Sequence, residues 1–183
     1  MLTSGFSAVS HRSVAARAGQ SLAATTYYFA SLDELLSAAL RDLAQKWLDV
    51  ARKSVEAQPR RLARGRFVDA VLGVLLLDEL PLAAFPVPPA NAVYERYLEA
   101  ARHPGLQEMV RDFDRQMDGL VLDLLRRTEL ACSGAIARLV IAAADGAILR
   151  ALAEGSDPRS ARSTLQTLVK RLPSDPGAGV RAS

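Results

Sequence analysis

The segment that most constrains the fold is SHRSVAARAGQSLAATTYYF, residues 10–29. Ser10 is a favourable N-cap, and small apolar residues recur behind it at helical spacing, so residues 10–17 are predicted to form one short helix. Gly19 comes next and tolerates the left-handed backbone conformation with which many helices end. This part of the sequence therefore predicts a helix that is followed at once by a tight turn.

A second short helix is predicted directly after the turn. Ser21 can cap it, and the helix extends from Leu22 to about Tyr28. Two short helices joined by a glycine-containing turn make a helix-turn-helix. The second helix is expected to present small and hydroxyl-bearing side chains outward, namely Ala23, Ala24, Thr25, Thr26 and Tyr27. Such a surface can enter the major groove of DNA, donate hydrogen bonds to phosphates and contact thymine methyl groups.

Residues 5–40 resemble the N-terminal domain of TetR-type transcriptional repressors. The matching positions are Gly5-Phe6, Val14-Ala15-Ala16-Arg17-Ala18-Gly19, Ser21, Tyr28-Phe29, Ser31 and Leu35-Leu36. A match at several fixed offsets is much more specific than a helix-turn-helix alone. The resemblance implies a DNA-binding head, followed by a helical body that binds an effector and forms a homodimer. After residue 40 the chain agrees with the family in architecture, with a weaker similarity near ADGAILRALAEG.

On this resemblance, the expected DNA-binding residues lie in and around the two short helices. They are Ser10, His11, Arg12, Gln20, Ser21, Ala24, Thr25, Thr26, Tyr27 and Tyr28. The resemblance also implies that Tyr27 points toward DNA, whereas Tyr28 and Phe29 lean toward the core of the head. Thr25 and Thr26 could read bases or face water. Either alternative is compatible with the sequence.

The sequence departs from the family pattern at three places. Thr26 stands where the family often has a tyrosine, and Leu32 stands where it usually has a lysine that contacts phosphate. Met1 lies so close to Gly5 that the helix preceding this position in the family is expected to be absent. These departures leave a second function open, that of a helical dimeric ligand-binding or scaffold protein that has lost DNA binding.

The composition favours helices and limits the cellular setting. The chain of 183 residues has few aromatic residues and much Ala, Leu and Arg, which favours an all-α fold. Its formal net charge of +3 permits binding to an anionic polymer without requiring it. Cys132 is the only cysteine, so an internal disulfide is excluded. With no signal peptide and no apolar run of the roughly 18 residues that span a membrane, we expect a cytoplasmic protein without a membrane partner.

The rest of the sequence predicts one long linking helix and five body helices. The linking helix begins after Ser31 and has an apolar stripe over five turns, whereas residues 67–80 are almost wholly apolar and predict a central helix. We expect a helix-turn-helix DNA-binding domain over residues 1–44. An effector-binding and dimerisation domain is expected over residues 45–173, and a disordered tail over residues 174–183.

The last two helices are expected to form the dimer interface. The resemblance implies a four-helix bundle between two subunits, and the helix from Ser133 to Ala153 is rich in small residues that let helix axes approach closely. The expected interface residues are Ile136, Leu139, Val140, Ala143, Ala147, Leu165, Leu168 and Val169. A twofold dimer is what a helix-turn-helix needs to read two palindromic half-sites about 34–36 Å apart.

An effector pocket is expected among the aromatic and methionine residues of the body. The candidates are Trp47, Phe67, Phe85, Tyr94, Tyr97, Met109, Phe113 and Met117. Most of these residues could equally be ordinary core residues. The resemblance implies a cavity between these helices, and the side chains suit a mostly apolar ligand with one or two polar groups.

Other polar clusters are interpreted as surface features. The basic group Arg60, Arg61, Arg64 and Arg66 is predicted to be a solvated helix start. Four aspartates, at positions 112, 114, 118 and 123, have no histidine with them, so no metal site is predicted. No nucleophile-base arrangement or phosphate-binding glycine loop occurs, and neither an enzyme nor a cofactor is expected.

Overall fold

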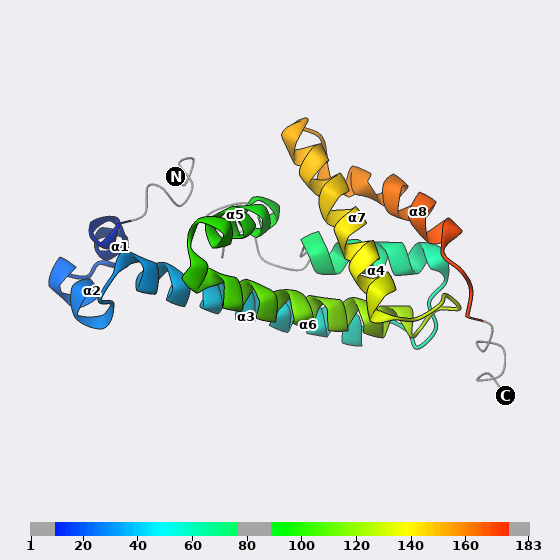
Figure 1. Cartoon of the computed structure of the whole chain (residues 1–183), viewed down its shortest axis with the longest axis horizontal. Coiled ribbons are helices and arrows are strands. Elements are labelled where there is room, and N and C mark those ends of the chain that lie inside the picture. Colours follow the sequence, from blue (N-terminus) through cyan, green and yellow to red (C-terminus); the bar gives the residue numbers. More distant parts are fainter. Residues whose placement is uncertain (1–9, 77–88, 176–183) are drawn as a thin grey trace. The chain divides into compact units, whose positions relative to one another are not determined.

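The computed structural model describes residues 10–76 and 89–175, and over these residues the chain is all-α, as predicted (Figure 1). The α-helices are α1 (His11–Ala18), α2 (Leu22–Tyr28), α3 (Leu32–Glu56), α4 (Arg64–Leu76), α5 (Pro89–Arg102), α6 (Gln107–Leu125), α7 (Gly134–Ala153) and α8 (Ala161–Arg171). Short 3-10 helices at Pro104–Leu106 and Pro158–Ser160 precede α6 and α8. The described part of the chain has no β-sheet, only an isolated antiparallel bridge between Leu130 and Ser174.

Side-chain caps determine where several helices begin. The Ser31 hydroxyl accepts a hydrogen bond from the Glu34 amide at the start of α3 (3.1 Å). At the start of α7, the Ser133 hydroxyl accepts from the Ile136 amide (3.2 Å). The Asp157 carboxylate accepts from the Arg159 amide (2.8 Å), with Pro158 at the first position of the 3-10 helix. Each cap satisfies an amide that would otherwise lack a partner, which is why these starts can be predicted locally.

The helices form two compact units. Among the described residues, the first unit contains 10–46 and 89–113, and the second contains 47–76 and 114–175. Helices α3 and α6 therefore contribute to both units. The first unit includes α5 and the start of α6 in addition to the helix-turn-helix, although the sequence analysis assigned these elements to the body. The functional division at residue 44 stays a prediction.

The first unit has an apolar cluster that joins residues far apart in the sequence. It is made of Leu40, Ala100, Leu106 and Val110, with Tyr97 and Met109 packed against it. The cluster draws α5 and the start of α6 onto α3. Nearby, His103 Nδ1 lies 3.5 Å from Asp33 Oδ1, and His103 Nε2 lies 3.4 Å from Glu99 Oε2.

The second unit is organised around α4. Phe67 and Val71 of this helix are fully buried, as the apolar sequence of this region predicts. Helix α8 packs against both α4 and α7 (Figure 1). Trp47 of α3 is also buried, and its indole Nε1 donates a hydrogen bond to the Val74 carbonyl of α4 (3.3 Å).

Candidate DNA interface and ligand pockets

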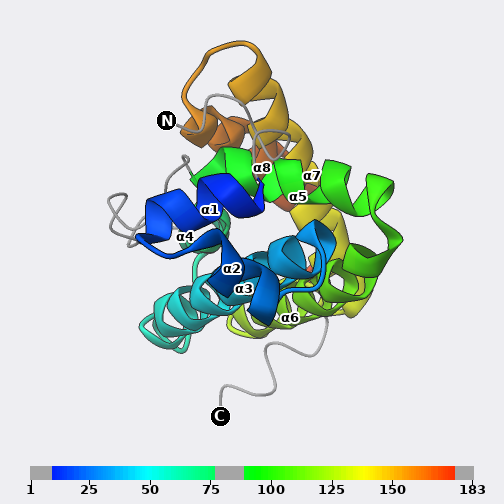
Figure 2. The same cartoon turned by 90° about the vertical axis from the view of Figure 1, so that its left-hand side faces the viewer.

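The predicted helix-turn-helix is present in the first unit (Figure 2). Helix α1 begins with a capping box, in which the Ser10 hydroxyl accepts from the Ser13 amide and the Ser13 hydroxyl accepts from the Ser10 amide. It ends at Gly19, whose φ of 63° is left-handed. The Ser21 hydroxyl then accepts from the Ala24 amide (3.0 Å) and starts α2. The caps and the glycine turn were all predictable, because they depend on residues within four positions of one another.

Gly19→Ala is expected to lower the free energy of unfolding by about 1–2 kcal/mol, because a Cβ atom disfavours the left-handed backbone. Guanidinium denaturation followed by circular dichroism measures this change. Gly65→Ala is a suitable control, because Gly65 is helical and an added Cβ would meet nothing within 4 Å. If both variants proved as stable as the parent protein, the turn would not require glycine.

Helix α2 presents only part of its predicted surface to solvent. Tyr27 is 85% exposed and Tyr28 73%, and their rings contact edge to face with centroids 5.2 Å apart. Thr26 is exposed as well. Thr25 is buried at 8% exposure, and its hydroxyl donates to the Leu22 carbonyl (2.9 Å).

Two expectations for α2 therefore change. Tyr28 was expected to lean toward the core, but it is exposed beside Tyr27. Thr25 was a candidate for base reading, but its buried hydroxyl is occupied by the helix backbone. Helical periodicity alone could not separate Thr25 from Thr26, because the seven residues of α2 contain no repeated apolar stripe that marks the buried face.

The remaining predicted DNA-binding residues are close in sequence to the exposed side chains of α2. Ser10, Arg12, Gln20 and Ser21 are exposed, and Ala24 is half-buried. His11 is half-buried, and its Nδ1 atom has no hydrogen-bond partner among the described residues. Together with Thr26, Tyr27 and Tyr28, the exposed side chains supply hydroxyl, amide and guanidinium groups, which are the groups that contact phosphates and base edges.

The predicted effector residues are divided between the two units. Trp47, Phe67 and Met117 are buried in the second unit. In the first unit, Tyr97 and Met109 pack on the apolar cluster, Phe113 is buried and Tyr94 is half-buried. Phe85 lies outside the described residues. Their place in an effector pocket stays a prediction.

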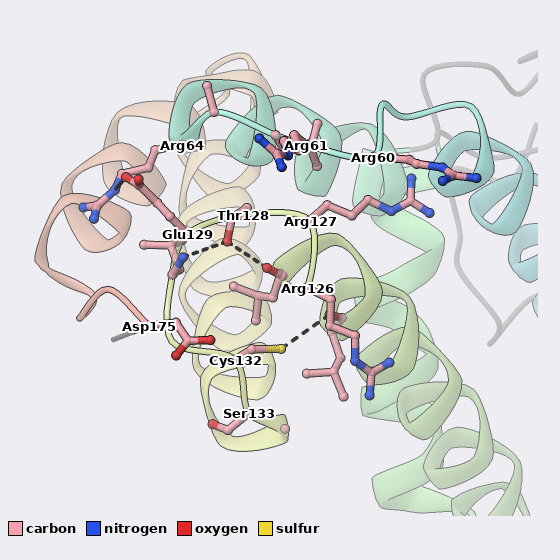
Figure 3. Close-up of a pocket in the computed structure, with 16 residues that line it drawn as sticks. Arg60, Arg61, Arg64, Arg126, Arg127, Thr128, Glu129, Cys132, Ser133 and Asp175 are labelled. Atoms are coloured by element: carbon pink, nitrogen blue, oxygen red, sulfur yellow. Dashed lines mark hydrogen bonds and ion pairs between the residues drawn. The ribbon is translucent and has the colours of Figure 1, made fainter. Parts of the chain in front are cut away.

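The second unit contains a polar cavity of about 1150 Å³ that none of the predicted effector residues lines (Figure 3). Arg60, Arg61 and Arg64 line it, and two further arginines, Arg126 and Arg127, come from the turn directly after α6. The sequence predicted a solvated helix start for the first three. The density of arginines after Pro59 is the feature of the sequence that indicates this site. Cys132 is exposed and also lines this cavity.

The predicted dimer residues separate into core and surface. Val140, Leu165 and Val169 are almost fully buried inside the protomer. Ile136, Ala143, Ala147 and Leu168 are half-buried, and Leu139 is 49% exposed. A different row of apolar and small residues is exposed along α7. It consists of Ala135, Leu139, Ala142, Gly146, Leu149 and Ala153, at alternating spacings of four and three residues.

The aspartates of α6 have individual partners. Asp118 lies 3.8 Å from Arg138, and burial raises the pKa of its carboxyl group despite this arginine. Asp123 pairs with Arg126 at 2.6 Å. Within the described ranges, no group of three or more His, Cys, Asp or Glu residues could hold a metal ion. No described helix is long and apolar enough to cross a membrane.

Comparisons with known proteins agree with this architecture. Residues 88–172 match the protein family described as tetracyclin repressor-like, C-terminal domain. The chain is 27% identical over 161 residues, covering 85% of this chain and 79% of the relative, to the HTH-type nicotine-responsive transcriptional repressor HdnoR of Paenarthrobacter nicotinovorans.

Two solved structures have a similar fold. One is a TetR transcription regulator from Haloarcula marismortui, with a TM-score of 0.68 and 21% identity over 90% of this chain and 85% of that chain. The other is the multidrug binding protein EbrR complexed with imidazole, with a TM-score of 0.65 and 28% identity over 92% of this chain and 86% of that chain.

Proposed function

We propose that this chain, which is similar to TetR-type transcriptional regulators, is a homodimeric repressor released from its operator by a small, mostly apolar effector. The observation that carries the DNA-binding part is the exposed surface of α2, which begins directly after a capped glycine turn. The side chains of Thr26, Tyr27 and Tyr28 contribute hydroxyl groups to that surface. The tyrosine hydroxyls can donate to phosphates. The Thr26 hydroxyl already donates to the Leu22 and Ala23 carbonyls (3.1 and 3.2 Å), so it can only accept from base edges in a major groove.

The exposed row on α7 supports dimerisation. Its alternating spacing of four and three residues places the six residues on one narrow face of the helix. Small residues in this row let two helices approach closely, and Leu139 and Leu149 provide the apolar area to be buried. A dimer would present two copies of α2 to half-sites about 34–36 Å apart.

The effector proposal is supported by the names of the relatives and by α3. One relative is described as nicotine-responsive and another as multidrug binding. Helix α3 contributes residues to both compact units, so it connects the head to the second unit through one continuous helix. An effector that binds one arrangement of the dimer more tightly than another shifts the population toward that arrangement. Operator affinity then falls by the ratio of the effector's affinities for the two arrangements, typically about 5- to 150-fold.

Tyr27→Ala is expected to lower operator affinity by about tenfold or more, since a hydrogen bond to a charged phosphate contributes roughly 1.5–3 kcal/mol. Fluorescence anisotropy measures this affinity on duplexes from the intergenic DNA beside the gene, over a range of salt concentrations. Leu98→Ala is a matched control, because Leu98 is an exposed apolar residue of α5. If both variants bound the operator with equal affinity, α2 would not be part of the DNA interface. If the parent protein bound none of the duplexes, the repressor proposal would be wrong, and the alternative of a dimeric ligand-binding protein without DNA binding would be favoured.

The effector part is tested by thermal-shift screening of apolar amines, with nicotine included. Each compound that raises the melting temperature is then added at saturation to the protein-operator complex. Release of the operator is the expected result. A compound that binds the protein tightly and leaves operator affinity unchanged would contradict the release mechanism.

A further inference from the structure

We propose that the arginine-lined cavity of the second unit binds a small polyanion that carries phosphate or carboxylate groups. We call this cavity the arginine pocket and define it by Arg60, Arg61, Arg64, Arg126 and Arg127. Of the described residues, only two carboxylates, those of Glu129 and Asp175, join these five arginines in the lining. The proposed ligand differs in chemistry from the apolar effector, and the site contains none of the residues expected for that effector.

The arginines of the pocket differ in how far they are already neutralised. Arg126 pairs with Asp123 at 2.6 Å, and Arg64 lies 3.4 Å from Glu129. Arg127 has no carboxylate partner among the described residues, but its guanidinium donates to two backbone carbonyls. Arg60 and Arg61 have neither an ion pair nor a side-chain hydrogen bond within the described part of the chain. Two uncompensated guanidinium groups on consecutive residues favour a ligand with more than one negative charge.

The loop that carries the two uncompensated arginines is held at both ends. Arg127 Nη1 donates to the Val55 and Gln58 carbonyls at 2.7 and 2.8 Å, which fixes the end of α3. The Leu62 amide donates to the Arg127 carbonyl at 2.7 Å, just after the loop. Figure 3 shows Arg60, Arg61 and Arg64 following one another along one rim of the cavity. Because the loop is already positioned, little conformational entropy has to be lost when a ligand binds.

The opposite wall is also built from tied segments. The Asp175 amide donates to the Glu129 carbonyl (2.8 Å), and the Ala131 amide donates to the Pro173 carbonyl (2.8 Å). These bonds hold the chain after α8 against the α6–α7 connection. Ser133 and Gly134 line the cavity at the start of the 20-residue helix α7, whose positive dipole end adds to the attraction for anions.

The size and lining of the pocket set the class of ligand. A volume of about 1150 Å³ is comparable to small-molecule sites, which are commonly about 300–1,000 Å³. Leu122, Leu125 and Leu130 add an apolar part to the lining. A compact metabolite with two or more anionic groups matches these features, whereas an uncharged apolar compound would supply no partner for the guanidinium groups of Arg60 and Arg61.

Isothermal titration calorimetry of the full chain with inorganic pyrophosphate and with citrate, in separate experiments without DNA, tests the proposal. Saturable binding of one anion per protomer, weakened by added salt, is expected, and the preferred probe distinguishes a phosphate from a carboxylate ligand. The double variant Arg60→Gln/Arg61→Gln should weaken this binding by about tenfold or more. Circular dichroism melting checks that the variant retains its fold.

The matched control is Arg150→Gln/Arg171→Gln, which removes the same charge from exposed positions outside the pocket. This control should bind the anion like the parent protein. Absence of saturable binding with both probes would overturn the proposal, and so would equal weakening by the two double variants, since that would be an effect of net charge alone. Because DNA is absent, neither outcome bears on the repressor function.

Discussion

Replacing both Leu139 and Leu149 by glutamate should convert the protein into a monomer and reduce its operator affinity by at least about 100-fold. Each side chain is 49% exposed on α7, in the row that we propose to form the dimer interface. Burying four carboxylates at a twofold interface would cost far more than the apolar contacts return. A monomer also loses the second half-site, and bivalent attachment commonly raises apparent affinity by about 10²- to 10⁴-fold.

Light scattering coupled to size-exclusion chromatography measures the mass, and anisotropy on the operator measures the affinity. Leu98→Glu is the control, because Leu98 is an equally apolar side chain at 58% exposure on α5. This variant should remain a dimer. If Leu139→Glu/Leu149→Glu also remained a dimer, the exposed row on α7 would not be the interface.

Phe67→Ala should lower the free energy of unfolding by about 3–5 kcal/mol, the usual cost of removing a buried aromatic side chain. Phe67 is at 0% exposure in α4, the central helix of the second unit. The removed ring leaves a cavity as well as losing its transfer free energy. Because whole domains are stable by only about 5–15 kcal/mol, this variant should unfold at a markedly lower guanidinium concentration.

Phe67→Leu provides the comparison, since a leucine fills much of the same volume and should lose considerably less stability. Denaturation followed by circular dichroism gives both values. A loss below about 1 kcal/mol for Phe67→Ala would show that α4 is not packed as described, because a well-packed core cannot close such a cavity without cost.

The helix-turn-helix illustrates what sequence could predict. Ser10, Gly19 and Ser21 determine the ends of α1 and α2 through hydrogen bonds and a backbone angle that involve only near neighbours. The same holds for the caps of α3 and α7. Capping involves residues that are close in sequence, so all the interacting groups can be identified from the sequence.

The division between core and surface was much less accessible from sequence. Val140, Leu165 and Val169 looked suitable for a dimer interface, but they are buried in the protomer. Helix α7 is apolar around most of its circumference, so periodicity cannot distinguish the face that packs on α8 from the face that remains exposed. Similarly, residues 25 and 26 are both threonine, and only packing makes Thr25 buried and Thr26 exposed.

By itself, therefore, the sequence determined the all-α class, the helix-turn-helix and most helix starts, because these follow from interactions between residues close in the chain. Tertiary structure alone decided that α5 packs with the first unit, that α7 keeps an exposed row, and that Arg60, Arg126 and Asp175 line one cavity. Arg60, Arg126 and Asp175 belong to segments that are up to 115 positions apart in the sequence. Contacts of this kind depend on how whole helices pack, and no local pattern encodes that arrangement.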